Sequence, residues 1–295
     1  MQSSRMLSHL EILWKESLLT FRSLGKERAF SGLSIALLAL GIGLASAVFT
    51  LLWQTIYAQL PVPDPDQVFT FSTNVTHMGR SESDAQAMAF SAPLYRYLAA
   101  HMKVTAGTVA RHGAQLNIDT PEGARHLTAD FVTDNFFQVL GVKPVIGRVI
   151  EETQNTVSDD HFVAVLSYDF WQEAYGGQMS AWNSLLQING ISVRIIGVTP
   201  PGFQGLIAGQ APKLYLPLAA YADLNPGWHG YDDWALRWLN VFTRLPTGTS
   251  PSTVEAELQP VYHAAVREEL ANGPSQPPDY LAELSHEHVS LVPAS

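Results

Sequence analysis

The most distinctive pattern along the chain is an uncharged apolar run near the N-terminus, AFSGLSIALLALGIGLASAVFTLLW, from Ala29 to Trp53. A helix needs about 20 residues to cross the hydrocarbon core of a bilayer, so this run is long enough to span. We predict a transmembrane helix over residues 29–57. Five Lys and Arg precede the run and none follows it before Arg80. The positive-inside rule therefore predicts that residues 1–28 are cytoplasmic and that the rest lies outside.

A cleaved signal peptide is the competing interpretation of this run. Ala45-Ser46-Ala47 has the small-x-small form of a cleavage site. The 28 residues before the run are long for the start of a signal peptide, and the apolar run continues past the supposed cut. Both points favour an uncleaved helix. Residues 1–28 have a helical stripe of hydrophobic residues beside Lys15, Arg22 and Lys26, which predicts an amphipathic helix on the cytoplasmic membrane surface. The alternative is that the same stripe docks on a cytoplasmic partner.

One face of the predicted span consists of small residues. Their spacing alternates between four and three, which is the spacing of a single helix face. Small side chains allow helix backbones to approach closely in lipid, where association depends on van der Waals contact. We therefore predict a helix-packing face formed by Gly32, Ala36, Ala39, Gly43, Ser46 and Thr50. The alternative is that single membrane helices are simply rich in Gly and Ala.

After a Pro-rich linker predicted over residues 58–67, short strands alternate with short helices. Ser91 and Ser167 are predicted N-caps of helices, and Gly176-Gly177 is predicted to end the second one. Asn189-Gly190 predicts a type I′ hairpin turn. Strands are predicted at 68–73, 104–118, 125–131, 162–166, 184–188, 191–198, 214–216, 236–245 and 289–292, and helices at 92–102, 134–140, 168–175 and from Pro251. This order predicts an α+β fold with mixed or antiparallel sheets.

Composition narrows the possible functions. Charged residues make up 15% of the chain and hydrophobic residues 46%, which is typical of a protein partly embedded in lipid. The formal net charge is −10, and five of the 17 Lys and Arg precede residue 30, so the remainder is acidic and unsuited to binding nucleic acid. The chain has no Cys, which excludes disulfides and thiolate metal sites.

Motifs for catalysis are mostly missing. The chain has no Walker A, G-x-S-x-G or H-E-x-x-H sequence. His286-Glu287-His288 would place two imidazoles on one strand face, but a metal site needs a third ligand, so a solvated pair is the simpler interpretation. The polar and aromatic segment Trp228–Trp234 could line a ligand or carbohydrate site, although a surface loop with buried tryptophans is the simpler interpretation here too. We predict no catalytic, cofactor-binding or metal site.

Several segments together resemble the MacB/FtsX-like permeases of ABC transporters, in particular the group called acidobacterial duplicated orphan permeases. The resemblance rests on the apolar span running into Leu60–Asp66, and on the stretches Asp134–Phe137, Val139–Val142, Gly147-Arg148, Val165–Tyr168, Phe170-Trp171, Asn189-Gly190, Ile196–Pro200, Gly202–Gly205, Arg244-Leu245 and Gly248.

This resemblance implies a membrane permease subunit, or the N-terminal part of one, with a two-lobed extracytoplasmic core domain at residues 68–295. Residues 68–105 and 240–295 would form one lobe, and residues 106–239 would form an inserted second lobe. The resemblance also implies mechanotransmission, in which a separate ABC ATPase binds and hydrolyses ATP and the outer domain moves, for export or efflux. Other permease helices would be partners. The second membrane helix would follow close to Ser295.

Two other classes of function remain open from the sequence. A membrane-anchored enzyme would use the Trp228–Trp234 segment, and a single-pass sensor would bind a ligand with its outer domain. The resemblance favours the permease, located in a bacterial inner membrane with its main domain in the periplasm.

Overall fold

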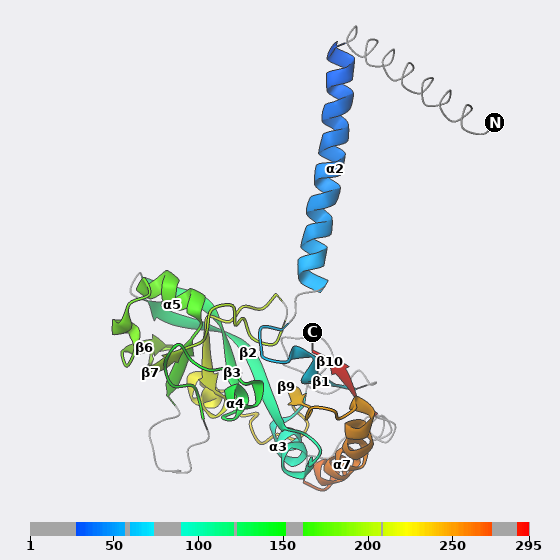
Figure 1. Ribbon diagram of the computed structural model, residues 1–295. Helices are drawn as coiled ribbons and strands as arrows, with labels where there is room; N and C mark the ends of the chain where they lie inside the picture. The colour runs from blue at the N-terminus through cyan, green and yellow to red at the C-terminus, as the bar shows by residue number, and fades with distance from the viewer. Residues whose placement is uncertain are drawn as a thin grey trace, which may run out of the picture. The chain divides into compact units, whose positions relative to one another are not determined.

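The computed structural model describes residues 28–56, 60–73, 90–120, 123–151, 162–207, 209–272 and 288–294. The chain forms two units, Met1–Ala58 and Gln59–Ser295. Each unit is described by itself (Figure 1). The amphipathic helix predicted over residues 1–28 lies almost wholly outside the described residues.

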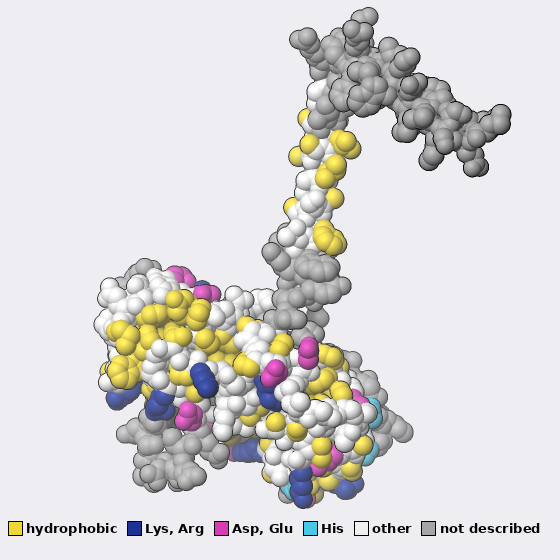
Figure 2. All heavy atoms as spheres, viewed as in Figure 1, with side chains coloured by type: hydrophobic (Ala, Val, Ile, Leu, Met, Phe, Trp, Pro, Cys, Tyr) yellow, Lys and Arg dark blue, Asp and Glu magenta, His cyan; other side chains and the backbone are white. Residues whose placement is uncertain are grey.

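The first unit contains one long helix, α2 (Arg28–Ile56). Large apolar side chains are exposed along it, among them Leu33, Leu40 and Leu44. Residues 29–56 contain no Asp, Glu, Lys or Arg, and the face of α2 seen in Figure 2 has no charged side chain. Within the described residues, no helix meets the length and hydropathy required to cross a membrane. The predicted span therefore stays a prediction.

The second unit contains an open antiparallel sheet at one end. Its strand order is β10 (Val289–Pro293), β1 (Val68–Thr73), β9 (Asn240–Arg244) and the first part of β2 (Gly107–Thr120). Two helices lie beside this sheet, α3 (Ala92–His101) and α7 (Pro251–Asn272) (Figure 1). Glu255 and Gln259 of α7 accept hydrogen bonds from the amides of Leu291 and Val289, so α7 covers amides of the edge strand β10.

The second half of β2 belongs to a closed barrel. The ring runs from β2 through β3 (Gly123–Val132), β8 (Leu214–Pro217), β5 (Val163–Leu166), β7 (Ile191–Val198) and β6 (Leu185–Ile188) back to β2. The pairs β3–β8 and β5–β7 are parallel and the other pairs in the ring are antiparallel. The prediction of an α+β fold with a mixed sheet is thus confirmed.

Shorter elements complete the unit. A two-residue strand, β4 (Ile146–Gly147), pairs with β7. The remaining helices are α4 (Phe136–Leu140), α5 (Tyr168–Tyr175) and α6 (Tyr221–Leu224), with 3-10 turns η1 (Pro65–Gln67), η2 (Met179–Ala181) and η3 (Leu218–Ala220).

The predicted caps and turns are confirmed. The Ser91 and Ser167 hydroxyls accept hydrogen bonds from the amides of Leu94 and Phe170 in the first turns of α3 and α5. Gly176 ends α5 at φ 58°. Asn189 and Gly190 adopt φ 50° and 84°, the positive values that a type I′ turn between β6 and β7 requires.

Two hydrophobic cores lie on opposite sides of the sheet. The larger fills the barrel and continues beneath α3 and α7, with Trp238, Phe131 and Leu258 fully buried. The smaller lies between the sheet and α4, and contains Phe136, Phe137 and Tyr215. On the surface, Figure 2 shows hydrophobic side chains gathered over the barrel.

One predicted strand begins later than expected. Residues 236–239 form only isolated bridges, including Phe90 with Leu239, and β9 starts at Asn240. Arg237 lies at one of these bridges, and its side chain forms a buried ion pair with Glu269.

Candidate functional site: the proximal-segment junction

The residues that lead into the second unit do not form a free spacer. We call Leu60–Val68 the proximal segment. Leu60, Val62 and Val68 are buried in the smaller core. Their neighbours in that core include aromatic and aliphatic residues of α4 and of the loop that follows it, namely Phe136, Phe137, Leu140 and Val142. Buried apolar side chains of this size stabilise a contact by about 1.5–3 kcal/mol each, so the segment is part of the domain.

The backbone of the proximal segment has a defined shape. The Val62 amide donates to the Leu60 carbonyl at 2.8 Å, and the Gln67 amide donates to the Asp64 carbonyl at 3.0 Å. Asp64 lies in the left-handed region at φ 47° and precedes the 3-10 turn η1. Asp is one of the few residues other than Gly that occupies this region with little cost. Proline at positions 61, 63 and 65 restricts φ further.

Arg244, at the end of β9, holds the proximal segment and α4 together. Its Nε donates to the Val139 carbonyl at 2.6 Å, and its Nη2 donates to the carbonyls of Leu140 at 3.1 Å and Pro63 at 2.9 Å. Its Nη1 also reaches the Gln67 side chain at 3.4 Å. One guanidinium thus joins three segments that are distant in sequence.

Electrostatics at Arg244 follow from its surroundings. Burial lowers the pKa of this guanidinium, and the nearby Asp64 carboxylate opposes the shift. Arg is so basic that it remains charged at neutral pH. Its partners include the last carbonyls of α4, where the helix leaves acceptors without intrahelical donors. The positive charge therefore stabilises the end of α4 and the proximal segment at the same time.

Two glycines lie at the contacts of α4. Gly141 ends α4 at φ 70°, a conformation that favours glycine, and a Cβ placed there would lie at an ordinary contact distance of 3.5 Å from Pro63 Cγ. Gly107 begins β2, and a Cβ there would lie 2.5 Å from Val139 Cγ2, closer than real Cβ contacts. Side chains of α4 thus sit directly on the β2 backbone.

The last described residues of the chain lie beside the proximal segment. The Ala294 amide donates to the Val68 carbonyl at 3.1 Å, and Phe69 is paired with Pro293 across β1 and β10. The proximal segment and the last described residues therefore lie next to each other at one end of the open sheet.

The Trp228–Trp234 segment is held by structural contacts. Trp228 packs edge-on against Tyr221 and Trp238, with ring centroids 4.6 Å apart in both pairs. Asp232 forms an exposed ion pair with Arg96 at 2.7 Å, and the Asp233 carboxylate accepts from the Ala235 amide at 2.9 Å. The two aspartates thus contact different partners, and the printed contacts of both lie within the domain.

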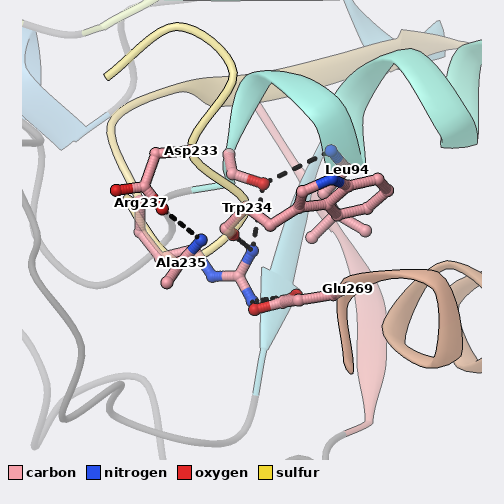
Figure 3. Close-up of polar contacts among 7 residues, drawn as sticks. Leu94, Asp233, Trp234, Ala235, Arg237 and Glu269 are labelled. Carbon is pink, nitrogen blue, oxygen red and sulfur yellow. Dashed lines mark hydrogen bonds and ion pairs between the residues drawn. The ribbon is translucent and has the colours of Figure 1, made fainter. Parts of the chain in front are cut away.

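Arg237, just after this segment, forms a buried ion pair (Figure 3). Its Nη2 donates to both Glu269 carboxylate oxygens at 3.1 and 2.8 Å, and both side chains are 1% exposed. Its Nη1 donates to the Ser91 hydroxyl at 3.3 Å and to the Trp234 carbonyl at 3.2 Å. Arg237 therefore connects the N-cap of α3, the Trp228–Trp234 segment and α7.

The remaining predicted site residues lie as follows. The small residues Gly32, Ala36, Ala39, Gly43, Ser46 and Thr50 are all exposed on α2, and the Thr50 hydroxyl donates to the Ser46 carbonyl at 2.8 Å. Their packing role stays a prediction. His286 and Glu287 lie outside the described residues, and among the described residues no group of three or more His, Asp and Glu lies close enough to hold a metal.

The sequence matches the model of the MacB-like periplasmic core domain over residues 31–261. The chain belongs to the MacB-like periplasmic core domain family. This family domain occurs in ABC transporter permeases, so the predicted family is confirmed at this level. The match extends over the proximal segment, α4 and Arg244, the three parts of the junction.

Three solved structures are similar to this chain. A domain of a protein described as a permease from Porphyromonas gingivalis has 14% sequence identity and a TM-score of 0.49, and the match covers 79% of this chain and 92% of that chain. The periplasmic region of MacB from Actinobacillus actinomycetemcomitans has 12% identity and a TM-score of 0.49, and the match covers 71% of this chain and 94% of that chain. The extracellular domain of the noncanonical ABC-type transporter YknZ from Gram-positive bacteria has 14% identity and a TM-score of 0.48, and the match covers 68% of this chain and 95% of that chain. No curated protein matches the chain.

Proposed function

We propose that this chain is a permease subunit, or the N-terminal part of one, in which the proximal-segment junction passes movement from the membrane to the periplasmic domain. A separate ABC ATPase would bind and hydrolyse ATP. Membership of the MacB-like family supports this proposal. The observation that carries it is the fixed attachment of Leu60–Val68 by core burial and by Arg244.

Mechanical coupling requires a stiff connection. A flexible linker would absorb a displacement, whereas a segment buried in the core and joined to it by hydrogen bonds moves with the domain. Hydrogen bonds that involve a charged group contribute about 1.5–3 kcal/mol each, so the contacts of Arg244 to Pro63, Val139 and Leu140 form a strong joint.

The proposal includes a membrane helix over residues 29–57 with a cytoplasmic N-terminus. The uncharged sequence from Ala29 to Trp53 and the exposed apolar side chains of α2 support it. Export or efflux across a bacterial inner membrane, and membership of the acidobacterial duplicated permease group, belong to the same proposal.

The coupling can be tested with pairs of introduced cysteines, because the chain has none of its own. Spin labels on Ser250 of the outer domain and on a partner permease should report a distance that changes on adding ATP and vanadate to membranes containing the co-purified ATPase. Arg244→Ala should abolish this change while the domain stays folded, and Arg244→Lys should restore it in part, because Lys lacks the planar fork of donors.

Arg96→Ala is the matched control, since Arg96 forms an exposed ion pair in the same domain. It should leave the distance change intact. A distance change that persists in Arg244→Ala would refute the coupling role of the junction, and a distance that never responds to nucleotide would refute the permease proposal itself.

The helix-packing face has its own test. Gly43→Leu should reduce co-purification with partner helices, while Gly41→Leu, two residues away and therefore on another side of α2, should not. Equal co-purification of both variants and the wild type would remove the packing role.

A further inference from the structure

A cleft of about 680 Å³ opens at the rim of the barrel, between the β6–β7 hairpin and the segment after α6. We call it the barrel-rim cleft. Its lining includes Asn117, Asp119, Asn189, Asn225, Tyr221 and Trp228. Its volume falls within the range of small-molecule sites in proteins. The cleft is distinct from the proximal-segment junction, and no residue lines both.

The walls of the barrel-rim cleft are fixed relative to one another. The Asn189 side chain accepts a hydrogen bond from the backbone N–H of Asn117 at 3.1 Å and donates one to the backbone carbonyl of Leu224 at 2.8 Å. It therefore joins the hairpin tip to β2 and to α6. The Asn225 side chain donates to the Tyr221 carbonyl at 2.8 Å. A ligand entering this cleft would meet a preformed site, which lowers the entropic cost of binding.

An indole ring forms one side of the cleft. Trp228 is half-buried, and its edge contacts with Tyr221 and Trp238, at interplanar angles of 82° and 66°, hold the ring in one orientation. A tryptophan fixed in this way offers an apolar ring surface. Such a surface suits the C–H groups on the face of a ring that also carries hydroxyls.

Hydrogen-bonding side chains also line the cleft. Asn117 and Asp119 are two residues apart on β2, so both side chains lie on the same face of the strand, and both are exposed. The Asp119 carboxylate accepts hydrogen bonds. The side-chain NH2 of Asn117 can donate them, while the side-chain oxygen of Asn117 contacts His126 Nδ1 at 2.9 Å. Hydroxyl groups, which both donate and accept, match this combination.

The charges of the lining residues favour a neutral ligand over an anion or a cation. Asp119 is the charged member of the lining, and the lining has no Lys or Arg to hold a phosphate or carboxylate. A single exposed carboxylate in high dielectric gives an organic cation little binding energy. We propose that the barrel-rim cleft binds a neutral oligosaccharide, with one sugar ring on Trp228 and its hydroxyls on Asn117 and Asp119.

Titration calorimetry of the full chain, in a detergent without a sugar headgroup, tests the proposal. The probes are maltotriose and tri-N-acetylchitotriose, with arginine amide as a cationic comparison. At least one sugar should bind with a Kd of about 1 mM or tighter. Asp119→Ala and Asn117→Ala should each weaken that binding by roughly tenfold, as expected for the loss of a polar contact. Both positions are exposed, so these variants should fold.

Trp182→Phe is the matched control, since Trp182 is an indole that lies outside the cleft and is 49% exposed. It should bind the sugar as the wild type does. The proposal is overturned if neither sugar binds, if arginine amide binds in place of the sugars, or if the cleft variants bind sugar unchanged.

Discussion

The buried Arg237–Glu269 pair gives a quantitative prediction. Glu269→Gln keeps the shape of the side chain but removes its charge, so the Arg237 side chain, which is 1% exposed, loses the charge of Glu269. Removing one partner of a buried pair typically costs about 3–5 kcal/mol. A domain of this kind has a free energy of unfolding of about 5–15 kcal/mol, so the loss would be a large part of the total.

The assay is urea unfolding of the purified chain, followed by tryptophan fluorescence and far-UV circular dichroism. With a slope of about 3 kcal/mol/M, the midpoint should fall by roughly 1–1.7 M. Asp232→Asn is the matched control, because Asp232 pairs with Arg96 at 2.7 Å but the two side chains are 79% and 49% exposed. Exposed pairs contribute about 0–1 kcal/mol, so this midpoint should hardly move.

A double variant separates the charge from the packing. Arg237→Met with Glu269→Leu removes both buried charges, and it should be more stable than Glu269→Gln alone because no guanidinium remains unpaired. The reasoning is refuted if Glu269→Gln and Asp232→Asn lower the midpoint by the same small amount.

Three further predictions concern backbone and charge. Gly197→Ala should prevent folding or lower the thermal midpoint strongly, because its Cβ would collide with the Arg148 carbonyl; soluble expression and a melting curve check this. Gly190→Ala meets no atom within 4 Å but must hold φ 84°, so it should cost about 1–2 kcal/mol in urea unfolding. Hydrogen bonds from Arg125 and Lys213 lower the pKa of Glu173 in the folded protein below 4.5. These contacts stabilise the fold fully above the pKa that Glu173 has in the unfolded chain, and the stabilisation is lost as the pH falls through the lower pKa of the folded protein. Glu173→Gln should therefore reduce the loss of unfolding free energy between neutral and acidic pH, measured by urea unfolding at several pH values.

Local signals in the sequence predicted much of the secondary structure. The Ser91 and Ser167 caps, the Gly176 stop and the Asn189-Gly190 turn each depend on the few residues around them, and the structure has all four. The start of β9 is different. Residues 236–239 are predicted as strand but form only isolated bridges, and the side chain of Arg237 pairs with Glu269, which lies 32 positions further along the chain.

The proximal-segment junction could be predicted only in part. Family resemblance pointed to Leu60–Asp66, Val139–Val142 and Arg244, but nothing local indicates that one guanidinium joins them, because the contacts span 104 to 181 positions of sequence. The closure of the barrel likewise depends on two parallel pairings and on the short β6–β2 contact. The partners of such long-range strand pairs are not indicated by the periodic pattern of hydrophobic residues in the sequence.

The 14-residue strand β2 pairs with β9 at its beginning and with β3 and β6 further on. No loop separates the open sheet from the barrel along this strand, so neither half can melt without breaking hydrogen bonds that the other half needs. Calorimetry should therefore record a single cooperative transition for both halves, with equal calorimetric and van't Hoff enthalpies.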